Sequence, residues 1–501
     1  MLSTTDPRTG TTTATDIAAT PDGEVGAIAD RAATAFTTLR QWSRDRRAGL
    51  LDALAAALEE HRDALVATAE RETGLGEGRL DGELTRSAFQ LRLFGEVIRE
   101  GAYLEATIDH AGDTPMGPGP DVRRMLVPIG PVAVFGSSNF PFAFSVPGGD
   151  TASALAAGCP VVLKAHGSHP LTSRLAHEVL AEAATAAGAP DGTLGIVYGT
   201  RAGATLVAHP AIQAVGFTGS LSTGEILLEI IGRREQPIPF YGELSSVNPL
   251  IVTPGAAAAR AEQLAEGLFA SVTGSAGQFC TKPGVAFVPR GAQALVDGLA
   301  ARARSAGGQP LLNARILASY GEIRERLISQ GRATVLAEGS TDDRGFSVAP
   351  SVLEIDAADV TPAVTEEAFG PLVVVVRYDD VAGIARALDQ VPHSLTASIH
   401  AEADETELVG ALVEEVRDRA GRIVFDGYPT GVRVAWAQHH GGPWPATNTQ
   451  HTSVGPTAIR RFLRPLAWQN APESVLPFEL RDADPGIPRR IDGVLSVPSV
   501  A

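Results

Sequence analysis

The sequence predicts an α/β protein in which parallel strands are connected by helices in two successive domains. From residue 131 onward, short β-branched runs such as VAVFG, VVLKAH, GIVYG and AVGFTGS alternate with helical runs, which is typical of a nucleotide-binding sheet. A second alternating set begins near residue 249 with PLIV and continues to PLVVVVRY and SLTASIH. The 501 residues are too many for one hydrophobic core, so two or three domains are expected.

The segments outside these two sets are expected to be helical before them and extended after them. Apolar residues recur at helical spacing over 48–69, and a second such pattern covers 84–98. A loop rich in Gly and Pro (AGDTPMGPGPD) follows, and then MLVPIGPVAVFG, which predicts a buried strand. The proline-rich stretch after Leu466 is too small to fold alone, so we expect an arm that pairs with something else.

Composition and charge exclude several classes of protein. Lys and Arg total 41 against 58 Asp and Glu, a net charge of -17, and no basic stripe carries interleaved aromatics, so nucleic acid is not an expected partner. The two cysteines, Cys159 and Cys280, exclude a disulfide framework and a CxxC metal site, which favours a reducing compartment and no metal. The N-terminus has neither a basic nor an apolar leader region, and no run of about 18 apolar residues occurs, so we expect a cytoplasmic protein without membrane contact.

Cys280 is the candidate nucleophile. It lies in SVTGSAGQFCTKPG, where glycines at 274, 277 and 284 let the backbone approach a ligand and let amides point at an oxyanion. An isolated cysteine is more often a small buried hydrophobe, but the polar, glycine-rich setting favours a thiol displayed at a turn. Cys159, in AAGCPVVLK, lies among Ala and Val, and a packing role is expected there.

Two polar side chains could act with Cys280. Glu243, in FYGELSSVNP, ends an apolar run, where a carboxylate is costly to bury unless it is hydrogen-bonded or works as a base with a raised pKa. Asn139, in FGSSNFPFAF, follows a strand and could donate its side-chain amide to a developing oxyanion. The alternatives are a solvated glutamate at a strand end and a turn-forming asparagine.

The signal for a cofactor is weaker. The segment FTGSLSTG at 217–224 predicts the end of a strand, a turn at Gly219 and Ser220, and a helix that includes Gly224. The backbone amides and the helix N-terminus in such a segment favour binding of a pyrophosphate. This is not the GxGxxG pattern, and alone it is a weak motif. Lys164, at the end of VVLK, could reach a ribose or phosphate, although an exposed strand-end lysine is the usual case.

Taken together and in this order, six motifs resemble those of the aldehyde dehydrogenase superfamily. They are NFP at 139–141, VVLK at 161–164, FTGS at 217–220, GEL at 242–244, GQFC at 277–280 and EEAFGP at 366–371. The resemblance spans nearly the whole chain, from DPRTG at 6–10 to the C-terminal arm.

The resemblance implies a fold of two Rossmann-type α/β domains plus a small β oligomerisation arm, assembled as a homodimer or homotetramer. The implied boundaries are 1–107 and 128–246 for the cofactor-binding domain, with a return segment at 438–466, then 247–437 for the catalytic domain and 108–127 with 467–501 for the arm.

The same resemblance implies roles residue by residue. Cys280 matches the nucleophile, Glu243 the general base, and Asn139 the oxyanion donor beside the Cys280 amide. The implied cofactor contacts are Lys164 for a ribose, Ser220 for the pyrophosphate, and Glu367 with Phe369 for the nicotinamide ribose and ring. The implied reaction is attack of a thiolate on an aldehyde, transfer of hydride to the nicotinamide, and hydrolysis of the resulting thioester by water that Glu243 activates.

Departures from the common pattern narrow the resemblance. Ser138 stands where a Trp often precedes the asparagine, ELSS replaces ELGG, and GGPWPATNTQHTSVG replaces the usual PFGG segment. Together with GELTRSAFQLRLF, GVRV and IRRFLRPLAWQ, these features resemble the subgroup of α-ketoglutaric semialdehyde (2,5-dioxopentanoate) dehydrogenases. That subgroup also resembles NADP-dependent long-chain fatty aldehyde dehydrogenases.

The expected cofactor is NADP, with NAD tolerated. NAD-preferring members carry a glutamate three residues after the lysine, where it repels a 2′-phosphate, and this chain has Gly167 there. Ser168 and His169 could donate hydrogen bonds to the phosphate.

The expected substrate is an anionic semialdehyde, which needs a cation at the far end of the substrate tunnel. Arg86 is the first candidate, because it lies on the helix that lines the family's substrate entrance; alternatively it is one of several arginines, such as Arg92, on a solvated face. The tunnel is expected to be lined by Phe140, Phe144, Phe279 and Trp444, which could equally serve a fatty aldehyde.

The sequence therefore leaves four candidate functions. The preferred one is oxidation of α-ketoglutaric semialdehyde to 2-oxoglutarate, and the second is oxidation of medium or long-chain aldehydes. Transfer of the acyl group to coenzyme A is disfavoured, since the acylating branch typically lacks the base that Glu243 supplies. A non-catalytic relative is disfavoured because both Cys280 and Glu243 are present.

Overall fold

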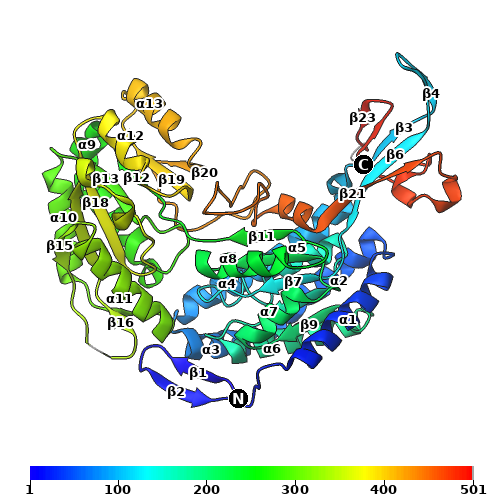
Figure 1. Ribbon diagram of the computed structural model, residues 1–501, viewed down its shortest axis with the longest axis horizontal. Helices are drawn as coiled ribbons and strands as arrows, with labels where there is room; N and C mark the ends of the chain where they lie inside the picture. The colour runs from blue at the N-terminus through cyan, green and yellow to red at the C-terminus, as the bar shows by residue number, and fades with distance from the viewer. Residues whose placement is uncertain (343, 499–501) are drawn as a thin grey trace.

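The computed structural model describes residues 1–342 and 344–498, which form two α/β lobes and a projecting β arm (Figure 1). The last three residues of the predicted arm, 499–501, lie outside the described residues. The predicted α/β fold is confirmed, since both large sheets are built from parallel strands with helices between them. Among the described helices, none combines the length and the apolar composition needed to cross a lipid bilayer.

The first lobe contains a five-stranded parallel sheet with the order β11-β10-β7-β8-β9. β8 and β10 lie on opposite sides of β7, so the strand order reverses at β7. Ligands of such sheets bind at this switch point, beyond the carboxyl ends of the strands. The strands are β7 Val132–Phe135, β8 Val161–Lys164, β9 Leu194–Val197, β10 Ala214–Thr218 and β11 Phe240–Glu243.

Helices cover both faces of this sheet. One hydrophobic cluster joins it to α1 Asp22–Leu39, α7 Thr200–Ala208 and α8 Leu221–Gly232. The other cluster joins it to α2 Arg44–Glu60, α3 Arg62–Thr73, α4 Glu77–Glu100, α5 Gly149–Ala157 and α6 Pro170–Ala186.

The second lobe contains a seven-stranded sheet with the order β15-β17-β18-β13-β12-β19-β20, in which the edge strand β15 is antiparallel. Neighbouring residues of β12 point to opposite faces, since Ile251 packs with α11, α12 and α13 whereas Leu250 packs with α9 and α10. The strands are β12 Leu250–Val252, β13 Val285–Pro289, β15 Thr334–Glu338, β17 Ser351–Asp356, β18 Leu372–Tyr378, β19 Ser394–His400 and β20 Ala420–Phe425. The helices are α9 Pro254–Thr273, α10 Gln293–Ser305, α11 Ala314–Ser329, α12 Val381–Leu388 and α13 Thr406–Val416.

A third sheet, with the order β21-β6-β3-β22-β23, forms the arm and pairs segments that are far apart in the sequence. Figure 1 shows it projecting from the first lobe, with the β4–β5 hairpin at its tip. The strands are β3 Thr107–Asp109, β4 Gly112–Thr114, β5 Gly117–Gly119, β6 Val122–Pro128, β21 Leu463–Gln469, β22 Arg489–Ile491 and β23 Val494–Ser496.

Two local predictions were wrong in detail. The segment MLVPIGPVAVFG is two strands in different sheets, because Pro128 and Pro131 lack a backbone N–H and Gly130 has a φ of 131°. The helix predicted over 48–69 is two helices, α2 and α3, since His61 leaves helical geometry. Residues 1–43, for which no element was predicted, contain α1 and a hairpin of β1 Ser3–Asp6 with β2 Thr11–Ala14.

Candidate active site

The loop that carries Cys280 has an unusual backbone. It follows α9 through a short helix, Gly274–Gly277, in which Ser275, Ala276 and Gly277 have φ values of 53°, 54° and 68°. A Cβ on Gly277 would lie 2.2 Å from the carbonyl oxygen of Gly370, so only glycine fits there. The Cys280 loop is thereby pressed against the EEAFGP segment.

The environment of Cys280 opposes ionisation of its thiol. The side chain is half-buried and faces a cavity between the lobes. Burial, followed by the negative charges of Glu243 and Glu367, raises the pKa of the Cys280 thiol well above its usual value. Proton removal at the moment of attack is therefore needed for this sulfur to act as a nucleophile.

Glu243 lies at the end of β11 with 3% of its surface exposed. Its Oε1 accepts a hydrogen bond from His440 Nε2 at 3.0 Å, and its Oε2 accepts one from Ser453 Oγ at 2.9 Å. Burial acts to raise the pKa of Glu243, but His440, Cys280 and Ser453 together lower it below the usual value. Of the two states expected for a buried carboxylate here, hydrogen-bonded or raised in pKa, the structure shows the first, because the charge and hydrogen bonds of these partners outweigh burial.

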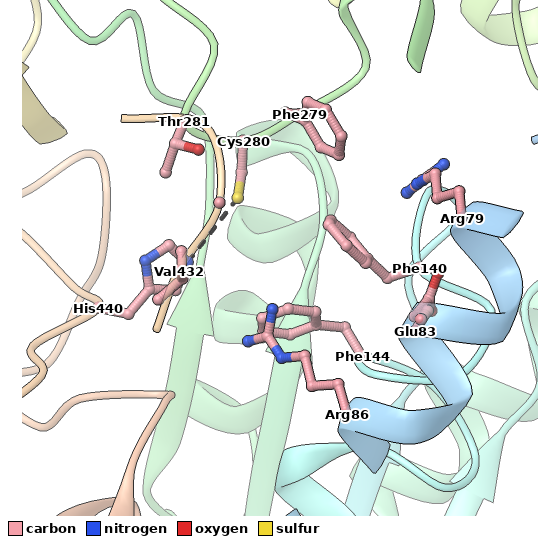
Figure 2. A pocket seen from close by; sticks show the side chains of 12 residues that line it. Arg79, Glu83, Arg86, Phe140, Phe144, Phe279, Cys280, Thr281, Val432 and His440 are labelled. Atoms are coloured by element: carbon pink, nitrogen blue, oxygen red, sulfur yellow. Dashed lines mark hydrogen bonds between the residues drawn. The ribbon is translucent and has the colours of Figure 1, made fainter. Parts of the chain in front are cut away.

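His440 is the residue that the sequence prediction missed. Its side chain is 1% exposed, and Nε2 lies 3.7 Å from Cys280 Sγ (Figure 2). The same atom lies 3.0 Å from Glu243 Oε1. The donor atoms of these three residues lie within 4.8 Å of one another, a set that a metal ion could also use. The sequence signal for His440 was the pair of adjacent histidines in AQHHGGPW. The segment described above as departing from the family pattern begins only at Gly441, one residue after His440.

Asn139 reaches the same place from the loop after β7. It is 6% exposed, and its Nδ2 donates to the carbonyl oxygen of Gln278 at 2.9 Å. Helix α4 holds this loop, since Arg79 Nη2 donates to the carbonyl oxygen of Asn139 at 2.6 Å and Glu83 Oε1 accepts from the amide of Phe142 at 2.7 Å. The structure thus brings together the three residues predicted to carry the chemistry.

A cavity of about 260 Å³ opens beside Cys280, between α4 and the Cys280 loop (Figure 2). Phe140, Phe144 and Phe279 line it, as predicted for the tunnel. Trp444 does not, because it is 48% exposed and is absent from the lining residues. The turn before Ala446, whose carbonyl oxygen accepts from the amide of Leu244 at 2.8 Å, carries Trp444 outward, so its predicted place was wrong.

Two arginines of α4 line the wall of this cavity. Nε and Nη2 of Arg86 and Nη1 of Arg79 are buried without a hydrogen-bond partner among the described residues. The Arg86 guanidinium lies 5.2 Å from the centre of the Phe144 ring, and Glu83 is the carboxylate between the two arginines. Arg92 differs, because it forms a surface ion pair with Glu59. Arg79 was not predicted, since nothing in the periodicity of α4 distinguishes it.

The residues predicted to hold a pyrophosphate lie at the switch point of the first sheet. Gly219 and Ser220 are exposed after β10, and Ser220 caps the N-terminus of α8. Gly224 is buried, and a Cβ on it would lie 2.4 Å from Leu244 Cδ2. Gly224 therefore permits close packing of α8 on the segment after β11, and its prediction as a direct cofactor contact was wrong.

The predicted 2′-phosphate residues differ in accessibility. Gly167 is exposed and faces open space, whereas Ser168 is 8% exposed and its Oγ accepts from Asn313 Nδ2 at 2.8 Å. His169 is fully buried, with Nε2 2.8 Å from the carbonyl oxygen of Ser137 and Nδ1 3.2 Å from Ser173 Oγ. Both ring nitrogens are occupied, so His169 cannot reach a phosphate as predicted.

The remaining predicted cofactor residues are half-buried. Lys164 ends β8, and burial lowers the pKa of its ammonium group. Glu367 and Phe369 lie in the segment pressed against the Cys280 loop, and Glu367 Oε2 accepts from the amide of Ser246 at 3.1 Å. Burial raises the pKa of Glu367 to about 7.

Comparison with known proteins gives the class. The sequence pattern of the aldehyde dehydrogenase family matches residues 1–442, so the chain belongs to this family and is an oxidoreductase that oxidises aldehydes.

Among its relatives, the chain is 41% identical over 481 residues to the alpha-ketoglutaric semialdehyde dehydrogenase of Acinetobacter baylyi, covering 94% of this chain and 91% of that protein. It is 42% identical over 482 residues to alpha-ketoglutaric semialdehyde dehydrogenase 2 of Azospirillum brasilense, with the same two coverages. An E. coli NADP dependent enzyme shares the fold with a TM-score of 0.79 and 24% identity, covering 93% of this chain and 94% of that one.

Proposed function

We propose that this protein oxidises α-ketoglutaric semialdehyde to 2-oxoglutarate, with NADP preferred and NAD tolerated, through a thioester on Cys280. One observation carries the proposal: a thiol, a carboxylate and an imidazole meet at one end of a cavity whose wall holds two arginines. The relatives named as alpha-ketoglutaric semialdehyde dehydrogenases support the same substrate.

The residues of the chain suit the two covalent steps. Glu243, which contacts the thiol directly, can take its proton, after which Sγ attacks the aldehyde carbon. The N–H of His440 Nε2 lies 3.7 Å from Sγ and is placed to stabilise the thiolate. The resulting oxyanion is placed to accept from the Asn139 side-chain amide and the Cys280 backbone amide. The nicotinamide cofactor, when bound, accepts the hydride that converts this adduct to a thioester.

The second step is hydrolysis. Once the thiol proton has passed from Glu243 to solvent, the lowered pKa of Glu243 keeps it ionised at neutral pH, so it can accept a proton from water. The water oxygen then attacks the thioester carbon, the carbon–sulfur bond breaks, and the thiol regains a proton. Release of free acid without coenzyme A is the expected result, which distinguishes this reaction from acyl transfer.

The arginines favour an anionic substrate over a fatty one. A buried guanidinium without a partner is costly, and a substrate carboxylate beside Arg86 and Arg79 would offset that cost. A cavity of about 260 Å³ suits a five-carbon chain. The aromatic lining keeps a medium-chain aldehyde as the second candidate.

The residues also fit a nicotinamide dinucleotide. Exposed Gly219 and Ser220 at the N-terminus of α8 suit the pyrophosphate, and Glu367 with Phe369 borders the Cys280 loop where the nicotinamide must lie. NADP is proposed because Gly167 offers open space and no carboxylate, with Ser168 as the nearby hydroxyl.

The domain boundaries given above are proposed for this chain, with a homodimer or homotetramer formed through the arm. Exposed apolar residues on β23, Val494 at 70% and Leu495 at 58%, support an interface there. A nucleophilic thiol works only when reduced, so the cytoplasm is the proposed compartment.

The test is a panel of aldehydes with NADP and NAD. We expect kcat/KM to be highest for 2,5-dioxopentanoate with NADP. Arg86→Ala should lower kcat/KM for this substrate by about 100-fold, because a charge-assisted hydrogen bond is lost, and should change that for hexanal little.

Arg92→Ala is the matched control, since Arg92 lies on the same helix in a surface ion pair and should leave both substrates unaffected. Equal losses for the two substrates in Arg86→Ala would contradict anchoring of the carboxylate. A higher kcat/KM for hexanal or decanal in the wild type would favour the second candidate.

A further inference from the structure

Lysine is rare in this chain, and both lysines lie at the proposed cofactor site. Lys164 and Lys282 are the two lysines among 41 cationic residues, all others being arginine. Lys282, two residues after the nucleophile, is 3% exposed and has no part in the chemistry proposed above. Because the chain uses arginine elsewhere, a lysine here points to a space that requires a compact ammonium group.

The ammonium group of Lys282 binds the backbone of the EEAFGP segment. Nζ donates to the carbonyl oxygen of Ala368 at 3.0 Å and to that of Leu372 at 2.8 Å. These carbonyls lie on either side of Phe369, and Glu367 directly precedes the first of them. A single buried cation therefore fixes the backbone that presents both predicted nicotinamide contacts.

Lys282 is also the cation that faces Glu367. Burial lowers the pKa of Lys282 to about 8 and raises that of Glu367 to about 7, while attraction between the two groups opposes both shifts. Glu243 is a second carboxylate close enough to raise the pKa of Glu367 further. Without Lys282, Glu367 would be a buried carboxylate beside another carboxylate and would be driven toward its neutral form.

The backbone around Lys282 is itself fixed to the Cys280 loop. Asn248 Nδ2 donates to the carbonyl oxygens of Cys280 at 2.8 Å and Lys282 at 3.0 Å. The ammonium group thus links the nucleophile segment to the cofactor segment in one rigid unit.

We propose that Lys282 is a positioning residue for the nicotinamide cofactor, which holds residues 367–369 in place through two backbone carbonyls and supplies the cation that faces Glu367. The inference rests on the proposed function, in which Glu367 contacts the cofactor. Lys282 acts on the cofactor only indirectly, through the side chain of Glu367 and the backbone of residues 367–369.

The experiment measures the Kd of NADPH by fluorescence titration, together with the rate of Cys280 alkylation by iodoacetamide in the absence of cofactor. Lys282→Met should raise the Kd by about tenfold or more, equivalent to losing one strong hydrogen bond, and should change the alkylation rate by less than about threefold. In an E367Q background, Lys282→Met should add a smaller loss, because the route through Glu367 is already removed and only the contacts with the backbone carbonyls remain.

Arg377→Met is the matched control. Arg377 is 7% exposed in the same lobe, pairs with Glu354 and donates to the carbonyl oxygens of Pro289 and Arg290, so its loss also removes a buried cation from carbonyls and a carboxylate. It should lower Tm but keep the wild-type Kd. If Lys282→Met alone does not fold, the double variant with E367Q, which removes both buried charges, is compared with E367Q.

An unchanged Kd in Lys282→Met would overturn the proposal, and so would an equal loss in Arg377→Met or a full additional loss in the E367Q background. Failure of the wild type to bind NADPH or NADH would instead contradict the proposed function.

Discussion

Cys280 sits among negative charges, yet the proposed reaction needs its thiolate. Burial, Glu243 and Glu367 hold the proton on the sulfur in the resting protein. A thiol in this state is protected from unproductive oxidation, since the thiolate is the reactive form. The N–H of His440 Nε2, 3.7 Å from Sγ, is placed to stabilise the thiolate once the proton has moved to Glu243.

The first prediction concerns His440. His440→Leu removes the N–H that is placed to stabilise the thiolate, so alkylation of Cys280 by iodoacetamide at pH 7 should slow by at least about tenfold. In the wild type, whose thiol pKa is raised, the alkylation rate should increase as pH rises beyond 9.

Cys280→Ala serves as the control and should show no alkylation, because Cys159 is fully buried and burial raises its pKa to about 11. A wild-type alkylation rate in His440→Leu would show that His440 does not stabilise the thiolate.

Among the single residues of the site, Cys280, Glu243 and Asn139 were predicted from the sequence because they lie in short motifs with a defined chemistry. The sequence prediction missed His440, which lies in an irregular segment and reaches the site because residues 440–455 fold back onto the end of β11. It misplaced His169 because a side chain at a strand–helix junction can point inward as readily as outward. Side-chain direction in loops depends on tertiary contacts that periodicity does not encode.

Helix α4 and the Cys280 loop show what single elements contribute. The apolar spacing predicted a helix within 84–98, but α4 extends from Glu77 to Glu100 and turns Arg79, Glu83 and Arg86 toward the active site. These residues are three and four positions apart, so they share one face. Sequence periodicity predicts such a face as solvated, and only its packing against the loop after β7 shows otherwise.

The second prediction tests the contact between the Cys280 loop and the EEAFGP segment. Gly277→Ala should lower kcat/KM by about 100-fold and destabilise the fold by about 2 kcal/mol, because the new Cβ meets the Gly370 backbone and the φ of 68° strains alanine. Enzyme assays and thermal unfolding measure both effects.

Gly410→Ala on α13 is the control, since a Cβ there meets nothing and alanine favours a helix. Full activity in Gly277→Ala would show that the two loops need not touch.

In the whole molecule, the active site lies where three parts of the chain meet. The first lobe supplies Glu243 and Asn139, the second supplies Cys280, and the segment leading to the arm supplies His440. The order of the motifs predicted two α/β domains, which follow from repeated strand–helix units. It did not predict how the lobes close on each other, because that depends on contacts between residues hundreds of positions apart.

The third prediction concerns assembly. Leu495→Asp on β23 should shift the protein from an oligomer to a monomer in light scattering, because a charge would be buried in the proposed interface. Val335→Asp, which changes a 45% exposed residue on β15 of the second lobe, should leave the mass unchanged. A monomeric wild type would contradict the arm as an interface.

The most direct test of the central claim is to trap the covalent intermediate in Glu243→Gln, which lacks the proposed base for hydrolysis. Mixing this variant with NADP and 2,5-dioxopentanoate should give NADPH equal to the active sites, formed more slowly than in the wild type because Glu243 also accepts the thiol proton, followed by still slower turnover. Mass spectrometry should then find the acyl group on the peptide containing Cys280. NADPH formation without an adduct on that peptide, or an adduct on another residue, would contradict the account.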